Sequence, residues 1–489
     1  MSFFSTKKIS WLSPGEFNSA GGYKELWRIA YPLVIMCASH TVMQFVDRMF
    51  LAWNSGEDVA AALPAGILYF TLFCFFSVTL GFTSAVVAQL FGAKENRGCV
   101  EAAITGFFIA IALALFVGLV NPLIGAFLMS SGTQANADIL NRQLAYFEGL
   151  RWSGAFVCMS TPLFAFFSGR GNTKPAALIN TFGCVLNIFL DYVFIFGKCG
   201  FPAWGICGAG IATTICTAVT FLIILIVYLS VDQKLFPTRS LFLPKWRYVS
   251  KLFKFGAPAG MQVFCDTGAF AVVVLLTGLL PTEAQSATTI ALSINNFAFV
   301  PMLGMADATA IVVGQYIGAK RKNVANRVAY RSWRMATLYM GCCALVYVTM
   351  PETLTRLFAP AEEGGAIDFS IVIENCRIIL ICAACFSVFD ATKFVFLSAL
   401  RGAGDTRFVF MISSGAAWLI LVPGVTILIV WLKVSVLAVW IFLTVYTCLD
   451  ACFMLWRFRT GKWRSITLVQ SEQLVTETPV GESAVTGQV

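Results

Sequence analysis

Long runs of hydrophobic residues, separated by short polar segments, make up most of the chain. A helix needs about 20 apolar residues to cross the hydrocarbon core of a bilayer. Runs of this kind cover residues 28–53, 62–91, 100–122, 140–168, 174–197, 207–231, 251–280, 285–317, 325–350, 370–400, 407–432 and 434–457. The pattern predicts an all-α membrane protein with about twelve transmembrane helices.

The composition supports a lipid environment. Of the 489 residues, 58% are hydrophobic and 12% are charged, and the mean hydropathy is +0.80. A soluble protein carries about 25% charged residues, so the polar side chains here are too few to cover a water-facing surface. The net charge is +9, and the basic residues lie in short loops between the apolar runs. This pattern indicates the orientation of the helices in the membrane, so we expect no nucleic-acid partner.

The loops alternate in charge along the chain. One set is basic and holds Lys94, Arg97, Arg170, Lys174, Lys234, Arg239, Lys245, Arg247, Lys320, Arg321, Lys322, Arg401 and Arg407. The other set is acidic and holds Glu57, Asp58, Asp138, Glu283, Glu362, Glu363 and Asp368. The positive-inside rule places the basic loops and both termini in the cytoplasm.

The two halves of the chain repeat each other. The segment from Gln89 to Lys94 recurs from Gln315 to Lys320, a shift of 226 (315 − 89), and the same shift carries Pro32 onto Pro258. The segment 169–173 recurs at 402–406 with a shift of 233 (402 − 169). Six helices therefore repeat as six more, which predicts two pseudo-symmetric six-helix lobes that rock about a central site. A duplicated channel without such rocking is the alternative.

The repeat also divides the chain into segments. We expect a cytoplasmic N-terminal segment (1–22), an N-lobe (23–231), a cytoplasmic linker (232–250), a C-lobe (251–458) and a tail (459–489). The tail begins basic and continues rich in Ser, Thr, Val and Glu without a helical pattern, so we expect it to be disordered.

Five acidic residues lie well inside the predicted helices: Asp47, Asp191, Asp266, Asp307 and Asp390. An ionisable group in the middle of a spanning helix costs about 2.5–3.5 kcal/mol on insertion scales. Several such groups in one chain are expected to face an aqueous cavity and to have a functional role.

The first group belongs to the N-lobe. Asp47 and Asp191 both lie in the outer part of their helices, and Asn187 lies one turn before Asp191 on the same face. With a hydroxyl such as that of Thr213, these side chains form an oxygen cage for Na⁺ or a proton relay. A purely structural hydrogen-bonded cluster is the alternative.

The second group belongs to the C-lobe. Asp266, Asp307 and Asp390 each lie about 11 or 12 residues from the inner ends of their helices, so at 1.5 Å per residue they share a depth near the midplane. We expect them to bind a cation or a cationic substrate, with Na⁺ at Asp266 and Asp390 as one option. Lys393, one turn from Asp390, either neutralises it or extends toward the cytoplasm.

Three other features leave alternatives open. His40 aligns with Asp266 under the repeat (266 − 226 = 40) and is either a proton relay or a buried neutral histidine. Cys199 and Cys207 flank one outer loop and either pair or remain free thiols. The motif from Cys382 to Cys385 has no second metal-binding pair, so we expect a packed helix face.

Motifs for ATP binding and for catalysis are missing from the sequence. The chain has no G-x-x-x-x-G-K-[S/T], G-x-S-x-G or H-E-x-x-H motif. We therefore expect neither an enzyme nor an ATP-driven pump, and no cofactor. An ion gradient is the remaining source of energy for transport.

Several motifs together resemble the MATE family of multidrug exporters, over residues 22 to about 458. They are the first-helix segment from Pro32 to Asp47, the loop 89–94, and the segments 187–197, 205–213, 256–260 and 400–406. The resemblance implies a V-shaped bundle of two lobes that performs antiport of drugs and cations.

The resemblance also implies roles for single residues. Asp47, Asn187, Asp191, Ala209 and Thr213 match the N-lobe cation site described for some members of the family. Asp266 and Asp390 match C-lobe acids of the NorM-like branch, and Pro32 matches a proline linked to helix bending. The chain departs from that branch at Asp266, where Glu is usual, and at Lys393 and Asp307, where uncharged residues are expected.

These observations predict a secondary active antiporter that exports organic cations or drugs in exchange for H⁺ or Na⁺ by alternating access. We expect a monomer in the bacterial inner membrane whose substrates are small cationic or amphipathic molecules. A lipid-linked oligosaccharide flippase of the same superfamily is the alternative, but it is expected to have extra helices and a basic cavity. A channel or polytopic receptor is a third class.

Overall fold

The computed structural model describes residues 17–131, 137–240, 243–358, 369–466 and 468. These residues form helices and no strand. Residues 1–16 of the N-terminal segment, the loop acids Glu362, Glu363 and Asp368, and residues 469–489 of the tail lie outside the described residues.

The helices of the first half coincide with the first six predicted runs. They are α2 (Tyr23–Asn54), α3 (Gly56–Gly81), α4 (Thr83–Gly92), α5 (Asn96–Ser131), α6 (Ala137–Gly149), α7 (Ser153–Gly169), α8 (Thr173–Phe196) and α9 (Gly205–Leu229). The runs at 62–91 and 140–168 are each divided into two helices, α3 with α4 and α6 with α7. We refer to α2–α9 as the N-lobe.

The helices of the second half coincide with the other six runs. They are α10 (Trp246–Lys251), η1 (Leu252–Gly256), α11 (Ala257–Thr277), α12 (Thr282–Gly318), α13 (Lys322–Thr349), α14 (Pro351–Arg356), α15 (Phe369–Ala403), α16 (Thr406–Ala416), η2 (Ala417–Leu421), α17 (Val422–Thr426), η3 (Ile427–Trp431), α18 (Val436–Arg459) and η4 (Lys462–Ser465). We refer to α11–α18 as the C-lobe.

Ten helices in the described part of the chain are long and apolar enough to cross a membrane. The other two predicted spans are helical as well. One is interrupted between α6 and α7, where the Gly149 carbonyl accepts a hydrogen bond from the Thr214 hydroxyl at 2.8 Å. The other, α13, carries several Lys and Arg residues over its first half, which lowers its hydropathy.

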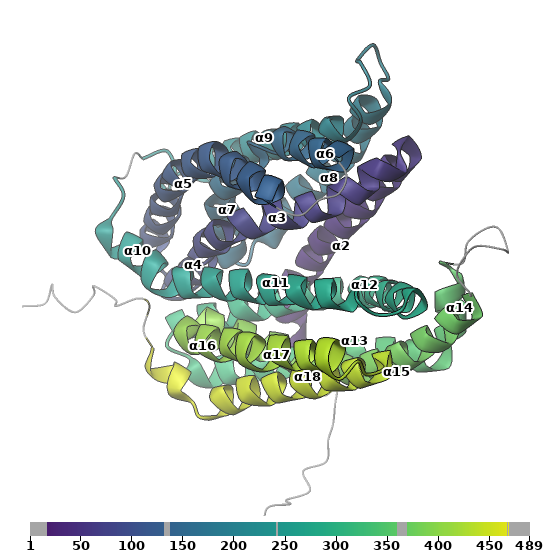
Figure 1. Ribbon diagram of the computed structural model, residues 1–489. Helices are drawn as coiled ribbons and strands as arrows, with labels where there is room; N and C mark the ends of the chain where they lie inside the picture. Colours follow the sequence, from purple (N-terminus) through teal and green to yellow (C-terminus); the bar gives the residue numbers. More distant parts are fainter. Residues whose placement is uncertain (1–16, 132–136, 241–242, 359–368, 467, 469–489) are drawn as a thin grey trace, which may run out of the picture.

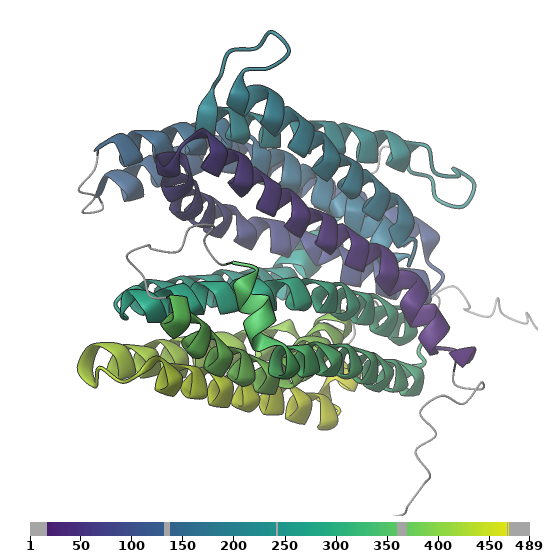
Figure 2. The same ribbon diagram turned by 90° about the vertical axis from the view of Figure 1, so that its right-hand side faces the viewer.

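The two lobes lie side by side and converge toward one end (Figure 1). Helix α10 lies at that end, which we call the linker end, and the helices of the two lobes diverge toward the opposite end. The perpendicular view in Figure 2 shows the same two stacked groups of helices, with α2 (purple) slanting from the upper group down to the lower one.

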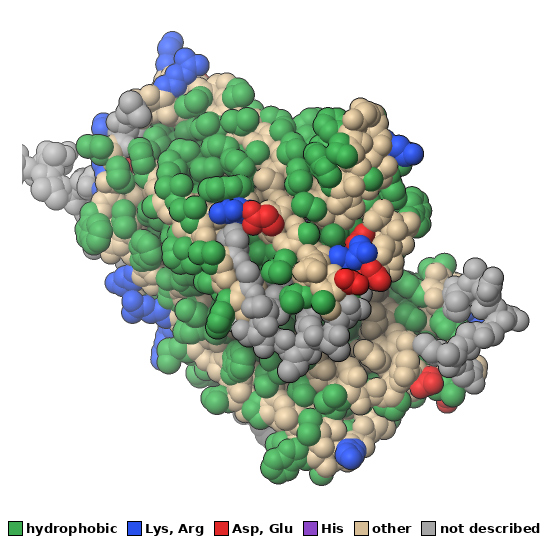
Figure 3. Space-filling view, turned by 45° about the horizontal axis from the view of Figure 1, so that its top comes forward, with side chains coloured by type: hydrophobic (Ala, Val, Ile, Leu, Met, Phe, Trp, Pro, Cys, Tyr) green, Lys and Arg blue, Asp and Glu red, His purple; other side chains and the backbone are tan. Residues whose placement is uncertain are grey.

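Large hydrophobic side chains remain exposed over the outside of both lobes. Leu178 of α8 is 71% exposed and Leu338 of α13 is 68% exposed. Figure 3 shows hydrophobic side chains over most of one face, with only scattered charged ones. A surface of this kind is stable in lipid and would associate in water, so the chain is an integral membrane protein.

The equivalent prolines of the two lobes stand in different surroundings. Pro32 is buried in the interior of the continuous helix α2, whereas Pro258 lies in the first turn of α11, directly after the π-helical turn η1. Proline lacks the N–H that would bond four residues back, and a π turn is one way to accommodate this loss.

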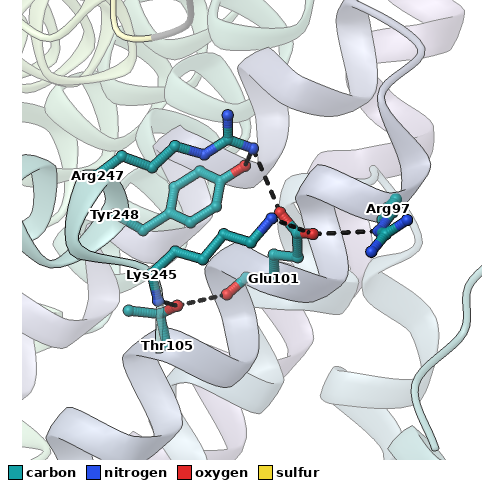
Figure 4. A network of polar contacts seen from close by, with 6 residues as sticks. All are labelled: Arg97, Glu101, Thr105, Lys245, Arg247 and Tyr248. Carbon is teal, nitrogen blue, oxygen red and sulfur yellow. Dashed lines mark hydrogen bonds and ion pairs between the residues drawn. The ribbon is translucent and has the colours of Figure 1, made fainter. Parts of the chain in front are cut away.

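The linker is attached to the N-lobe through one buried carboxylate (Figure 4). Glu101 of α5 binds Lys245 Nζ at 2.6 Å, Arg97 Nε at 3.2 Å and Arg247 Nη2 at 3.3 Å. The backbone N–H of Lys245 also donates to Thr105 Oγ1 at 3.2 Å. The basic residues at the start of α10 are thereby held against α5.

The lobes contact each other closely at the linker end. Helix α4 packs against the last turns of α12, and a Cβ added to Gly92 or Gly318 would overlap a backbone carbonyl of the other lobe. Hydrogen bonds cross this boundary: Gln89 Nε2 donates to the Gly402 carbonyl at 3.0 Å, Gln315 Nε2 donates to the Gly169 carbonyl at 2.8 Å, and the Tyr316 hydroxyl donates to Glu25 Oε2 at 2.8 Å.

Candidate functional site

The predicted N-lobe residues lie together between α8 and α9. Asn187 and Asp191 are buried one turn apart on α8, and Asn187 Nδ2 lies 3.4 Å from Asp191 Oδ1. The same Nδ2 lies 3.4 Å from Thr213 Oγ1 of α9, and that hydroxyl donates to the Ala209 carbonyl at 3.0 Å. Four of the five predicted residues therefore form one connected set.

Asp47 of α2 interacts electrostatically with this set. Asp47 and Asp191 lie close enough to repel each other, and buried Tyr146 of α6 interacts with both carboxylates. Asp47 Oδ1 and Asp191 Oδ2 are both buried and have no hydrogen-bond partner. Buried polar atoms are normally paired, so two unpartnered carboxylate oxygens in one place indicate a site for a positively charged ligand.

The chemistry of the N-lobe set suits a small cation. Two carboxylates, one carboxamide, one hydroxyl and one carbonyl offer oxygen atoms, which are the ligands that hard cations take. A proton shared between the two carboxylates would relieve the same repulsion. Among the described residues, no group of three His, Cys, Asp or Glu side chains is placed to hold a metal ion, so a Na⁺ ion here would also need the amide and hydroxyl oxygens.

In the C-lobe, Asp266 of α11 is held by a chain of polar contacts. Its Oδ2 accepts hydrogen bonds from Gln262 Nε2 at 2.9 Å and from Ser413 Oγ at 3.3 Å. Arg401 Nη2 donates to Gln262 Oε1 at 2.8 Å and thereby orients the amide. Asp266 Oδ1 is buried and has no hydrogen-bond partner.

Asp390 of α15 lies near a buried ion pair. Lys393, one turn later on the same helix, forms an ion pair with Asp450 of α18 at 2.8 Å. Lys393 therefore neither pairs mainly with Asp390 nor extends to the membrane surface. Its charge still acts on both Asp390 and Asp266. The structure thus places Asp266 and Asp390 around one lysine.

Asp307 lies apart from that lysine. Its side chain, on α12 at the boundary between the lobes, is exposed, and it interacts with Cys37 of α2 and with Arg401. Arg401 also acts on Asp266 and so connects the two acids. Asp307 therefore lies between Cys37 of the N-lobe and Arg401 of the C-lobe.

Three other expectations concern single side chains. His40 of α2 has an exposed side chain, and its role stays a prediction. Cys199 and Cys207 are both free thiols. Pro32 is buried inside α2, on the helix that carries Asp47.

Several residues of the N-lobe and C-lobe sets were not predicted as site residues from the sequence. The most important is Asp450, which is the only acid of α18 and is fully buried. It lies in the middle of the predicted run 434–457, so its position alone could have identified it. Tyr146, Gln262, Ser413 and Arg401 carry no such signal, because polar residues of these types occur throughout the chain.

Comparison with known families finds the same division of the chain. The MatE family model matches residues 32–193 and 258–427. The two matches begin 226 residues apart (258 − 32), which is the shift of the internal repeat. Both matched blocks contain the acids described above, Asp47 and Asp191 in the first and Asp266, Asp307 and Asp390 in the second.

Curated relatives cover nearly the full chain. The probable multidrug resistance protein NorM of Bradyrhizobium diazoefficiens is 28% identical over 445 residues, which are 90% of this chain and 94% of the relative. The multidrug resistance protein NorM of Vibrio vulnificus is 27% identical over 405 residues, 81% of this chain and 86% of the relative.

Solved structures share the fold. A MOP superfamily transporter from Pyrococcus furiosus matches with a TM-score of 0.81 and 19% identity, over 92% of this chain and 98% of that one. A multidrug resistance MATE transporter in an outward-facing conformation also matches with a TM-score of 0.81, over 91% and 97% of the two chains. With both halves matched by the family model and the fold shared, this chain belongs to the MatE family of membrane transporters.

Proposed function

We propose that this protein is a secondary active antiporter that exports organic cations or drugs in exchange for H⁺ or Na⁺ by alternating access. One observation carries the proposal: each lobe holds carboxylates within its helices, and some of their oxygen atoms are buried and lack a hydrogen-bond partner. Such groups are costly inside a membrane and are expected to bind a cation that compensates them.

The two sets suit different ligands. The N-lobe set is compact, with its oxygens contributed by α2, α8 and α9, and it fits a small coupling ion. The C-lobe set extends from Asp266 and Asp390 to exposed Asp307 at the boundary between the lobes, and it fits a larger organic cation. Relatives named multidrug resistance proteins support export of drugs.

The closed linker end supports alternating access. The two lobes touch through α4 and α12 at that end and diverge toward the other. We place the linker end in the cytoplasm of a bacterial cell, at the inner membrane, because the basic loops gather there. The conformation then opens outward, and transport requires that the contacts at the linker end separate.

An ion gradient supplies enough energy for this exchange. One positive charge that crosses about 100 mV releases about 2.3 kcal/mol, enough for roughly 50-fold accumulation. If one monovalent drug leaves for each H⁺ that enters, no net charge moves and only the concentration gradient contributes. Separate carboxylate sets in the two lobes allow more than one ion per cycle.

The test is efflux of a fluorescent organic cation from vesicles under separately imposed H⁺ and Na⁺ gradients. We expect efflux with at least one of the two gradients and none without either. D266N should abolish efflux with normal membrane insertion, because the C-lobe set then lacks one carboxylate. Unchanged efflux by D266N would remove Asp266 from the site.

A lipid-linked oligosaccharide flippase is the second candidate. Such a protein handles an anionic diphosphate headgroup and would need basic side chains in its cavity, whereas the two described sets contain six acids besides Lys393 and Arg401. Transport of a lipid-linked sugar without cation exchange would favour this candidate.

A further inference from the structure

The ion pair between Lys393 and Asp450 lies beside the C-lobe set and has no part in the exchange just proposed. It joins α15 to α18 at 2.8 Å, with side-chain exposures of 14% for Lys393 and 0% for Asp450. Removing two charges from water costs more than their attraction commonly returns, so a buried ion pair is weak evidence of a stabilising role. Its position therefore requires another explanation.

Lys393 has two carboxylates within reach that differ in accessibility. Asp450 is fully buried, whereas Asp390, one turn before Lys393 on α15, is partly exposed. Residues three apart on a helix are neighbours, so rotation of the lysine side chain suffices to exchange one partner for the other. The centroids of the Phe394 and Tyr446 rings lie 5.3 and 6.0 Å from Nζ, so the ammonium lies among aromatic side chains that favour a cation.

We propose that Lys393 is a tethered competitor of the cationic substrate, and that Asp450 determines substrate affinity by holding the Lys393 ammonium away from Asp390. The inference rests on the proposed function, because it assigns Asp266 and Asp390 to the organic cation. While Lys393 is paired with Asp450, both acids are available to the substrate. When Lys393 turns to Asp390, its ammonium replaces the substrate and Asp390 is not left without a partner.

The proposal predicts opposite effects for the two members of the pair. D450N releases Lys393 to Asp390 and should weaken substrate binding, whereas K393M removes the competing charge and should strengthen it. The double variant K393M/D450N lacks the competing charge, so the loss of Asp450 has no further effect and it should bind as K393M does. A merely structural ion pair predicts that both single variants weaken binding alike.

The experiment measures binding of tetraphenylphosphonium to the full-length protein in lipid nanodiscs by calorimetry. We expect D450N to raise Kd about tenfold or more, K393M to lower it about threefold, and the double variant to match K393M. D405N is the matched control, because Asp405 and Arg457 form a similar pair at 2.7 Å, with exposures of 5% and 14%, remote from Asp390. Its Kd should not change.

Each outcome decides the question. Equal Kd for D450N and the unsubstituted protein overturns the inference, as does an equal loss of binding in D450N and K393M. If D450N does not fold, K393M alone decides, since a higher Kd in K393M contradicts competition. Failure of the unsubstituted protein to bind tetraphenylphosphonium would instead contradict the proposed function.

Discussion

The side-chain amide of Gln89 in the N-lobe donates a hydrogen bond to the carbonyl of Gly402 in the C-lobe, at 3.0 Å. The internal repeat supplies the reciprocal bond, from Gln315 to the Gly169 carbonyl at 2.8 Å. Gln315 is the counterpart of Gln89 (315 − 226 = 89), and Gly402 is the counterpart of Gly169 (402 − 233 = 169). The duplicated motifs thus bind each other across the boundary and hold the linker end closed.

Removal of both glutamines should open the linker end more often. In Q89A/Q315A two hydrogen bonds between the lobes are lost, each worth about 0.5–1.5 kcal/mol. We expect faster hydrogen–deuterium exchange in 83–92 and 312–318, measured by mass spectrometry. Q233A is the matched control, because Gln233 donates to the Val231 carbonyl within the linker at 2.7 Å. Equal exchange in the two variants would contradict a role of the pair in closure.

The two glycines at the same boundary should not tolerate a side chain. G92A and G318A each place a methyl group against a backbone carbonyl of the opposite lobe, and such overpacking costs about 1–3 kcal/mol. We expect both variants to insert normally but to lose most cation efflux in vesicles. G341A should keep efflux, because nothing lies within 4 Å of a Cβ at Gly341. Full efflux by G92A would show that the closed contact is not needed.

The N-lobe carboxylates should control ion coupling. D191N removes one of two repelling charges and leaves the Asn187 and Thr213 contacts in place, so we expect loss of gradient-driven efflux with little change in thermal stability. N187A should retain part of the efflux but require a steeper gradient. D232N, in the linker, is the control. If D191N still responds to both gradients, the coupling ion binds elsewhere.

The buried carboxylate of Glu101, which binds the linker, should contribute to the stability of the protein. E101Q removes the negative charge that contacts Lys245 and Arg247, and we expect about 1–3 kcal/mol lower stability and faster trypsin cleavage of the linker. E148Q breaks an exposed pair with Arg151 and should change stability by less than about 1 kcal/mol. A similar melting temperature for both variants would show that the Glu101 network does not stabilise the linker.

The spans, the repeat and the placement of most acids inside helices could be read from the sequence. A run of apolar residues long enough for a bilayer is a property of a continuous segment, and so is the position of Asp47 or Asp266 within it. The interruption between α6 and α7 could not be read, because it depends on the contact of Gly149 with Thr214 of a different helix.

The partner of each charge was decided only by the tertiary structure. The sequence allows Lys393 either to neutralise Asp390, one turn away, or to extend toward the cytoplasm, yet it pairs with Asp450 of another helix. Asp307 was grouped with Asp266 from its position in the helix, but it interacts with Cys37 of the opposite lobe. Hydrophobic length fixes how deep a residue lies in the membrane, whereas helix rotation and packing between distant segments fix what it meets there.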